Sequence, residues 1–546
     1  MRKIIFLAAS CFLMTSCVID KRDLQTAEEK YTESFVEMFG NTDPEHTWMM
    51  VDNQTVEVDL DKPSRVKVYV KVGMNYKLAA DYENVSGKRE LRFDAPMGCE
   101  DVYVTVDGVP YQEGSSAGSR TFISTEEGKD VISVSQNEND YRVYTYGQIN
   151  VFRNDKETLP ERKDNTKKVN MDYVAKPETG KTYTFYPLFW NAHFSHTFGL
   201  YYFIGETKYE FDFYKDKEGD CLQFKNSAGE WENVTMNYVF DVLNDREFQN
   251  SDEVLRSKPY TITFPKDTKQ FGFYVKIYEP NAAKELVFRA KYYSNPALNV
   301  VPNTDTQSFS SFAYLELGEG ENAKTYITIE DHNRDDFDYN DFIFVMEGKQ
   351  SHIEEDPVEY IYAVEDLGGT DDFDFNDVVF SVSHVAGQPH AIVKLLAAGG
   401  TLPADICFGE TSYGEVHEMF DVATTEMVNT AEGTTKENMK NAKPFTVNVG
   451  TEWSHKDLDY TEEFDPKNGF NVKVNNNAIT IYNPGKDAAP QILVLTPNWL
   501  WPTERTRISD AYSNFGEWGD NYTNSEWVNT RDNSKVIDWV GTPANQ

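Results

Sequence analysis

Apolar and polar residues alternate with a period of two along much of the chain, as they do in strands that bury one face. The clearest early examples are Arg65 to Val72 (RVKVYVKV) and Asp101 to Val106 (DVYVTV). Further strands are predicted at Gly199 to Gly205, Tyr260 to Phe264, Gly272 to Ile277 and Lys324 to Ile329. The pattern predicts a mainly β protein built from several β-sandwich-like modules with a few short helices.

Helical periodicity is confined to short segments. Tyr31 to Phe39 is predicted to be an amphipathic helix that ends at Gly40, a common stop signal. Two more short helices are predicted near Val416 to Phe420 and after Ser509. We expect Ser509 to cap the last helix, because Asp510 would then lie in its first turn, where the helix dipole favours an acid.

The N-terminus has the order of an export signal. Arg2 and Lys3 precede an apolar run from Ile4 to Met14, and small residues then lead to Cys17. The apolar run is shorter than the about 20 residues that cross a bilayer as a helix. We predict that residues 1–16 are a signal peptide, that Cys17 is lipidated and that residues 17–30 are a polar spacer. The tetrapeptide ending at Cys17 resembles a bacterial lipobox, with its leucine one place early; ordinary secretion remains the alternative.

The length of 546 residues suggests about three to five domains. We predict a short helix and connection over 31–50, an independent N-terminal β-sandwich over 51–150, a second β domain over 165–350 and a C-terminal domain over 356–546. The last boundary is placed at the acidic, proline-containing segment Glu354 to Pro357.

The formal net charge of -38 argues against nucleic acid as a partner, because such a field repels phosphates. It fits either bound cations or a well-solvated acidic surface. With Cys11 in the signal peptide and Cys17 lipidated, the remaining cysteines are Cys99, Cys221 and Cys407. They allow one disulfide at most, and we interpret them as small buried apolar residues.

One acidic pattern occurs twice. Glu330 to Phe344 reads EDHNRDDFDYNDFIF, and Glu365 to Phe380 reads EDLGGTDDFDFNDVVF. In each copy an acidic pair ends a strand, and Asp-Phe-Asp-aromatic-Asn-Asp then runs into an apolar strand. Each copy is predicted to be a strand-loop-strand unit whose crowded carboxylates repel one another unless a cation binds.

Calcium is the cation that this pattern favours, because it takes six to eight oxygen ligands in flexible geometry. An EF-hand is excluded, since Asp341 or Asp377 stands where the loop needs glycine and the flanks are strands. Solvated acidic hairpins and a magnesium or manganese site are the alternatives. The loop aromatics Phe337, Tyr339, Phe373 and Phe375 are interpreted as packing residues. The predicted calcium ligands are Asp336, Asp338, Asn340, Asp341, Asp372, Asp374, Asn376 and Asp377, with Glu330, Asp331, Glu365 and Asp366 as further candidates.

These residues carry a family resemblance. The first copy, with YYSNPALN at Tyr292 to Asn299, resembles the DUF4114 domain. The second copy resembles the start of the LruC domain (DUF4842), a family of bacterial envelope lipoproteins. Three later segments resemble that family's C-terminal half: KLLAAGGTLPADI at Lys394 to Ile406, EVHEMF at Glu415 to Phe420 and WPTERTRISDAYSNFGEW at Trp501 to Trp518. The resemblance covers roughly residues 180 to 546 and implies an envelope location, β architecture and metal sites, but no activity.

No HExxH, GxSxG or P-loop motif appears, and the pair His193 and His196 lacks a convincing third zinc ligand. Two carboxylates across a cleft would suffice for a glycosidase, so that activity is not excluded. Six tryptophans lie after residue 450 and could stack on sugars, although we favour a core role: Trp453, Trp499, Trp501, Trp518, Trp527 and Trp539.

We therefore expect a non-catalytic, calcium-stabilised binding or adhesion lipoprotein. It would be lipid-anchored in the outer membrane of a Gram-negative bacterium and exposed at the cell surface. Its ligand would be a glycan or an envelope or host protein. A structural envelope component and a carbohydrate-active enzyme are the alternatives.

Overall fold

The structure is a computed structural model and confirms a mainly β protein with few, short helices. The described residues are 26–111, 122–123, 132–137, 139–145, 148, 174–178, 180–190, 194–215, 222–233, 252, 254–283, 285–299, 311–318, 322–330, 339, 341–348, 353–367, 372–456, 469–485 and 488–539. Within these ranges the strands form six sheets. The predicted signal peptide, residues 1–16, and the predicted lipidation site Cys17 lie outside them.

The N-terminal sheet is built on one long hairpin. Two strands of 22 residues pair antiparallel along their length, and a parallel edge strand from much later in the chain joins the second of them. The order is β21 (Ile353–Pro357), β2 (Asn75–Pro96), β1 (Val51–Val72), β3 (Val102–Val106) and β4 (Val109–Pro110).

The middle module is a sandwich of two larger sheets with a small third sheet beside it. Phe198 from one large sheet and Phe344 from the other stack with ring centroids 4.2 Å apart, so the two sheets face one another. The first large sheet contains β17 (Leu286–Tyr293), β16 (Thr268–Pro280), β10 (Ser195–Ile204), β11 (Thr207–Lys215) and β5 (Phe122–Ile123), with β8 (Val174–Ala175) paired to β16. The second contains β18 (Phe312–Leu317), β19 (Lys324–Ile329), β20 (Phe342–Glu347), β9 (Thr182–Trp190), β15 (Tyr260–Thr263) and β6 (Ser133–Ser135). The small sheet contains β13 (Trp231–Asn233), β12 (Leu222–Lys225), β14 (Val254–Ser257) and β7 (Arg142–Thr145).

The C-terminal module is a second sandwich. Tyr362 and Phe470 face one another across its two sheets, with ring centroids 5.6 Å apart. One sheet contains β27 (Phe445–Asn448), β24 (His390–Ala397), β23 (Val378–His384), β22 (Glu359–Val364) and β30 (Ile492–Leu495). The other contains β26 (Thr411–Glu415), β25 (Ala404–Phe408), β28 (Phe470–Val474) and β29 (Ile479–Ile481).

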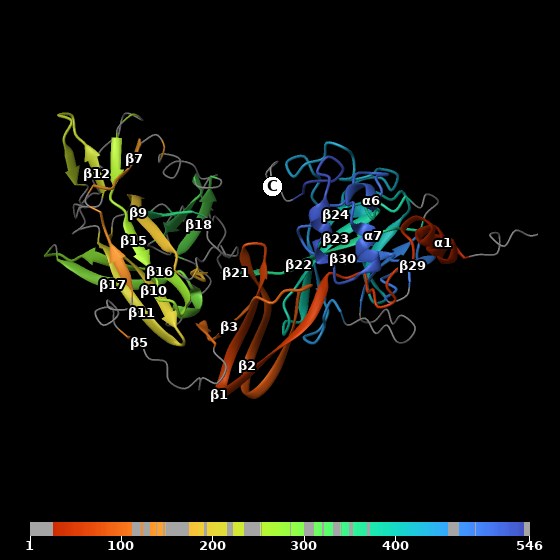
Figure 1. The fold of residues 1–546 in the computed structure, drawn as a ribbon, viewed down its shortest axis with the longest axis horizontal. Coiled ribbons are helices and arrows are strands. Elements are labelled where there is room, and N and C mark those ends of the chain that lie inside the picture. Colours follow the sequence, from red (N-terminus) through yellow and green to blue (C-terminus); the bar gives the residue numbers. More distant parts are fainter. Residues whose placement is uncertain are drawn as a thin grey trace, which may run out of the picture.

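The N-terminal sheet joins the two sandwiches, and Figure 1 shows β1 and β2 between them. Val68, Val70 and Phe93 belong to the same apolar cluster as the core of the C-terminal sandwich. On the other side, Val109 packs with Tyr201 of the middle sandwich. Each sandwich therefore takes part of its packing from this one sheet.

The predicted sandwich over residues 51–150 is wrong. Residues 51–110 form a single sheet, whereas β5, β6 and β7 belong to the sheets of the middle module. The alternation of Arg65 to Val72 did indicate a covered face, but the cover comes from residues more than 280 positions later, such as Val358. The predicted boundary at Glu354 to Pro357 is strand β21, whose Glu354 and Glu355 pair with Lys77 and Lys67 of the long hairpin.

The predicted helices are present with shifted ends. Helix α1 (Ala27–Phe39) ends at Gly40 as expected but starts inside the predicted spacer, because Thr26 and Glu29 form a capping box. Helix α5 (Val416–Met419) lies where predicted. Ser509 is not an N-cap, since α6 (Ile508–Ala511) begins one residue before it and Arg507 holds the cap position without a side-chain hydrogen bond. The remaining described helices are α7 (Phe515–Asp520) and the 3₁₀ turns η3 (Pro296–Leu298) and η6 (Ser525–Thr530).

Tryptophans form much of the C-terminal core, which confirms the packing interpretation. Trp499, Trp501, Trp518 and Trp527 are fully buried. Cys407 is buried and Cys99 half-buried, and both are free thiols, whereas Cys221 lies outside the described ranges. In the part of the chain that the structure describes, no helix has both the length and the apolar character to cross a membrane.

The shared core predicts the behaviour of an isolated fragment. We expect residues 51–150 alone to lack a cooperative thermal transition and to bind the dye ANS, because the face with Val68, Val70 and Phe93 loses its cover. Circular dichroism melting and dye fluorescence provide the measurement. A sharp thermal transition without ANS binding would show instead that residues 51–150 fold independently.

Candidate functional site

The site is the loop between two core strands of the C-terminal sandwich. Strands β22 and β23 pair antiparallel, with Val364 opposite Val378. Glu365 and Asp366 follow the first strand directly, and Asp377 directly precedes the second. The second acidic copy is therefore the strand-loop-strand unit that the sequence predicts.

Three carboxylates meet in this loop. Glu365, Asp372 and Asp374 each offer an oxygen that lies within 4.8 Å of the oxygens offered by the other two. Glu365 and Asp374 are buried and Asp372 is half-buried. Oxygen ligands at this spacing suit a hard cation such as calcium.

Backbone N–H groups hold two of these carboxylates in place. The amides of Phe373 and Phe375 donate to Glu365 at 3.3 and 3.1 Å. Phe373 and Phe375 have φ angles of 52° and 53°, so alternate residues of the loop adopt the left-handed conformation. Asp374 accepts from the amides of Asn376 at 3.2 Å and Arg505 at 2.8 Å.

The other acidic pair closes the base of the loop. The backbone amide of Asp366 donates to the Asp377 carboxylate at 2.7 Å. Asn376 is fully buried, and its Nδ2 donates to the Pro502 carbonyl at 3.0 Å, whereas its Oδ1 is buried without a hydrogen-bond partner. An unsatisfied buried acceptor costs about 1–3 kcal/mol, so this loop carries a polar oxygen that a ligand could satisfy.

Burial and mutual repulsion keep protons on this cluster. Desolvation, reinforced by Asp372, raises the pKa of Asp374 from 3.8 to about 8. Burial and the neighbouring aspartates also raise the pKa of Glu365 and Asp377 well above their usual range. A divalent cation would replace these protons and remove the repulsion.

Aromatic side chains fix the loop against the N-terminal helix, which confirms that they are packing residues. The ring of Phe373 lies 5.1 Å from Tyr31, 5.7 Å from Phe35 and 5.6 Å from Phe39, all on α1. Phe375 is fully buried near Phe515. The acidic loop therefore connects α1 to the C-terminal sandwich.

Two glycines pack directly beneath the loop. The amides of Gly399 and Gly400 donate to the carbonyl of Asp377 at 3.0 and 3.1 Å. A Cβ on Gly399 would stand 2.2 Å from Asn376 Oδ1, and one on Gly400 would stand 2.8 Å from Asp366 Oδ2. Only glycine lets the backbone come this close to the acidic side chains.

Gly399, Gly400 and Arg505 support the acidic loop but were not among the predicted site residues, although they lie in segments that resemble the LruC domain. Gly399 and Gly400 lie in the segment Lys394 to Ile406, and Arg505 lies in the segment that begins at Trp501. His417, from the segment Glu415 to Phe420, contacts the Gly400 carbonyl at 3.0 Å through Nε2. The three segments thus meet at the acidic loop or directly beneath it.

The first acidic copy is described at three of its predicted residues. Strands β19 and β20 pair with Ile329 opposite Phe342. Tyr339 has a φ of 54°, and its amide donates to Glu330 at 3.4 Å, as Phe375 does to Glu365. Asp341 is half-buried at the start of β20. The other predicted residues of this copy, Asp331, Asp336, Phe337, Asp338 and Asn340, lie outside the described ranges.

Neither His193 nor His196 belongs to the metal-spaced cluster found among the described residues. His196 is buried in β10, and its ring lies 5.8 Å from that of Phe342. His193 lies outside the described ranges. Among the residues that are described, the acidic group of Glu365, Asp372 and Asp374 is the one cluster spaced for a metal.

No family model matches the chain, and no curated protein matches it. Among solved structures, it is similar to a protein named "putative lipoprotein" from Bacteroides ovatus, at 13% identity and a TM-score of 0.19 over 49% of this chain and 90% of that one. It is also similar to an alpha-L-rhamnosidase from Streptomyces avermitilis, at 9% identity and a TM-score of 0.10 over 83% of this chain and 41% of the enzyme.

The glycine packing gives a first test of the loop. We expect Gly399→Ala to lower the free energy of unfolding by about 1–3 kcal/mol, because the added methyl would press on Asn376. Gly516→Ala is the control, since nothing lies within 4 Å of its Cβ. Because Gly516 lies in helix α7, this change should leave the stability unchanged or raise it by up to about 1 kcal/mol. Urea denaturation measures both variants, and a Gly399→Ala chain as stable as the unchanged protein would contradict the tight packing of the loop.

The raised pKa of Asp374 gives a second test. Without calcium, the folded state holds protons that the unfolded state has already lost, so the free energy of unfolding should fall as pH rises from about 4 to about 8. Asp374→Asn should flatten this fall, whereas the exposed Asp59→Asn should not. Melting temperatures in EDTA across that range provide the measurement. An unchanged slope in Asp374→Asn would contradict the assignment.

Proposed function

We propose that the chain is a non-catalytic lipoprotein, displayed at the surface of the outer membrane of a Gram-negative bacterium, that binds or adheres to a ligand and is stabilised by calcium. The observation that carries the calcium part is the group of Glu365, Asp372 and Asp374. Each offers one carboxylate oxygen within 4.8 Å of the other two, in a loop fixed by backbone hydrogen bonds. The envelope location rests on the export signal, on Cys17 and on the resemblance to the LruC family.

The proposed ion would be held by Glu365, Asp372 and Asp374, with Asp366, Asn376 and Asp377 as further proposed oxygen donors. Its charge would offset carboxylates that burial otherwise keeps protonated. Because Phe373 packs on α1, ordering the loop would also fix the helix that follows the membrane spacer. Calcium would then stabilise the attachment of the folded body to its anchor.

The repeat supports a second ion in the first loop. The proposed ligands there are Asp336, Asp338, Asn340 and Asp341, with Glu330 and Asp331 as further candidates. Glu330 and Tyr339 already form the backbone contact that Glu365 and Phe375 form in the second copy. The two ions would stabilise the middle and C-terminal sandwiches separately.

The alternatives are a structural envelope component and a carbohydrate-active enzyme. A glycan array and a panel of glycosidase substrates separate them. Binding without turnover supports the proposal, turnover supports the enzyme, and neither binding nor turnover favours the structural role.

Calcium should raise the melting temperature. If the ion binds only the folded state, a calcium concentration ~100 times the dissociation constant adds about 2.7 kcal/mol. For a domain of about 150–250 residues, this added free energy corresponds to a rise of roughly 5–10 °C in the melting temperature. Sites outside the cell often have affinities of order 10⁻⁴ to 10⁻³ M, so scanning calorimetry should reach millimolar calcium. EDTA should reverse the shift.

Single variants assign the shift to the two loops. Asp374→Ala and Asp338→Ala should each remove part of it. Arg334→Ala, a change of a neighbouring residue that is not a proposed ligand, should leave it intact. Identical melting in millimolar calcium and in EDTA would favour solvated acidic hairpins instead.

A further inference from the structure

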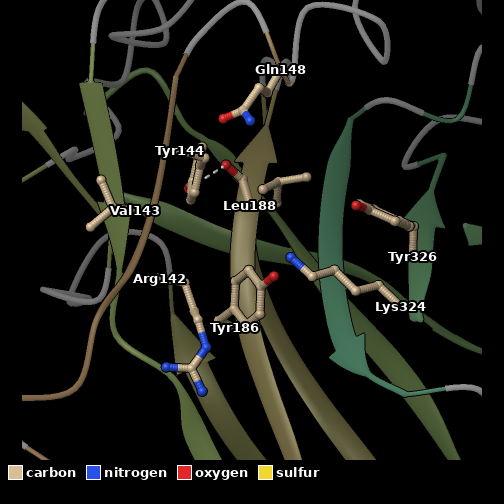
Figure 2. Close-up of a pocket in the computed structure, with 8 residues that line it drawn as sticks. All are labelled: Arg142, Val143, Tyr144, Gln148, Tyr186, Leu188, Lys324 and Tyr326. Atoms are coloured by element: carbon tan, nitrogen blue, oxygen red, sulfur yellow. Dashed lines mark hydrogen bonds between the residues drawn. The ribbon is translucent and has the colours of Figure 1, made fainter. Parts of the chain in front are cut away.

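A cavity of about 190 Å³ lies in the middle sandwich, away from the acidic loop of the C-terminal module. Figure 2 shows it between β7, β9 and β19. Pockets that enclose drug-sized ligands measure about 300–1,000 Å³, so this one suits a single ring-sized group.

Tyrosines supply most of its specific chemistry. The hydroxyl of Tyr144 donates to the Leu188 carbonyl at 2.9 Å, which fixes one wall. Figure 2 shows the Tyr326 hydroxyl reaching from β19 toward β9, which carries Tyr186. The hydroxyls of Tyr186 and Tyr326 are protonated at neutral pH, and burial raises the pKa of both further. The lining therefore offers ring surfaces together with hydrogen-bonding groups.

Two cations line the cavity, and they differ in their partners. Arg142 forms ion pairs with both Glu347 and Asp140, so it is already engaged by two carboxylates. The ammonium of Lys324 lies 5.8 Å from the centroid of the Tyr186 ring. No carboxylate among the described residues forms an ion pair with it. A half-buried cation of this kind in a chain of net charge -38 is available to an anionic ligand.

We propose that this cavity binds one carboxylate-bearing sugar residue, such as a uronic acid, with the carboxylate on Lys324 and a ring face against Tyr186. A sugar ring has an apolar face that packs on a tyrosine and hydroxyl groups that pair with tyrosine hydroxyls. The carboxylate of the sugar supplies the negative charge with which Lys324 would form an ion pair. The inference rests on the proposed binding function, because it names the class of ligand.

The test uses the full mature chain with Cys17→Ser, titrated with methyl glucuronide and methyl galacturonide and followed by calorimetry and by NMR. Methyl glucoside and methyl galactoside are the uncharged counterparts, and acetate presents the carboxylate alone. We expect the uronides to bind at least tenfold more tightly than either comparison set. Lys324→Met should reduce uronide affinity at least tenfold, and Tyr326→Phe should reduce it to a smaller extent.

Lys225→Met is the matched control, because Lys225 also lies over an aromatic ring, 5.9 Å from Trp231, but outside the cavity. Uronide binding that survives Lys324→Met, equal binding of charged and uncharged sugars, equal binding of acetate, or no binding at all would each overturn the inference. Calcium-dependent melting is measured on the same samples. Absent uronide binding with an intact calcium response would overturn this inference alone, whereas uronide binding without a calcium response would overturn only the metal proposal.

Discussion

Repulsion between buried carboxylates in the loop from Glu365 to Asp377 is the constraint on which the packing of the C-terminal half depends. Two unit charges 4.8 Å apart repel by roughly 3–4 kcal/mol at an effective dielectric constant of about 20. Backbone amides offset part of this cost, and protons or a cation must offset the rest. The same loop packs on α1, on the two glycines and on the segment around Arg505, so its electrostatics bear on three separate parts of the chain.

The long hairpin of β1 and β2 gives the molecule its continuity. Its Val68, Val70 and Phe93 complete the core of the C-terminal sandwich. Strand β4 packs against the middle sandwich through Val109, and β3 contacts it through the hydrogen bond from the Tyr103 hydroxyl to Gln270. Strand β21 returns between the two sandwiches and pairs with β2, where Glu354 and Glu355 meet lysines. The N-terminal sheet consequently shares the core of the C-terminal sandwich and contacts the middle one through a separate small cluster. It also has a small apolar cluster of its own, which includes Val58, Leu60 and Leu91.

Local patterns predicted local structure well. The alternation of residues 324 to 329 gives β19 with the predicted ends, and the acidic repeat correctly predicts two hairpins. The pattern could not say what covers an apolar face, because a period of two fixes which side chains point inward but not their partner. That is why Val70 was assigned to a sandwich of its own. The start of α1 was missed because the capping box of Thr26 lies in a polar stretch without hydrophobic periodicity.

The acidic residues of the candidate site could be predicted from the sequence, whereas the residues that hold the loop in place could not. Glu365, Asp372 and Asp374 stand out by charge density, whereas Gly399 contributes by having no side chain, and Arg505 by a backbone amide. Backbone amides can form such contacts whatever the residue type, so a single sequence does not predict them. The segments that resemble the LruC domain were the one sequence feature that marked these residues.

Calorimetric titration of calcium at pH 7, in two buffers of different ionisation enthalpy, tests the central claim most directly. Because Asp374 has a pKa of about 8 in the metal-free fold, binding should release about one proton or more per ion at the second loop. Asp374→Asn should reduce this release. Binding heat that is independent of the buffer, or no binding at millimolar calcium, would contradict the account.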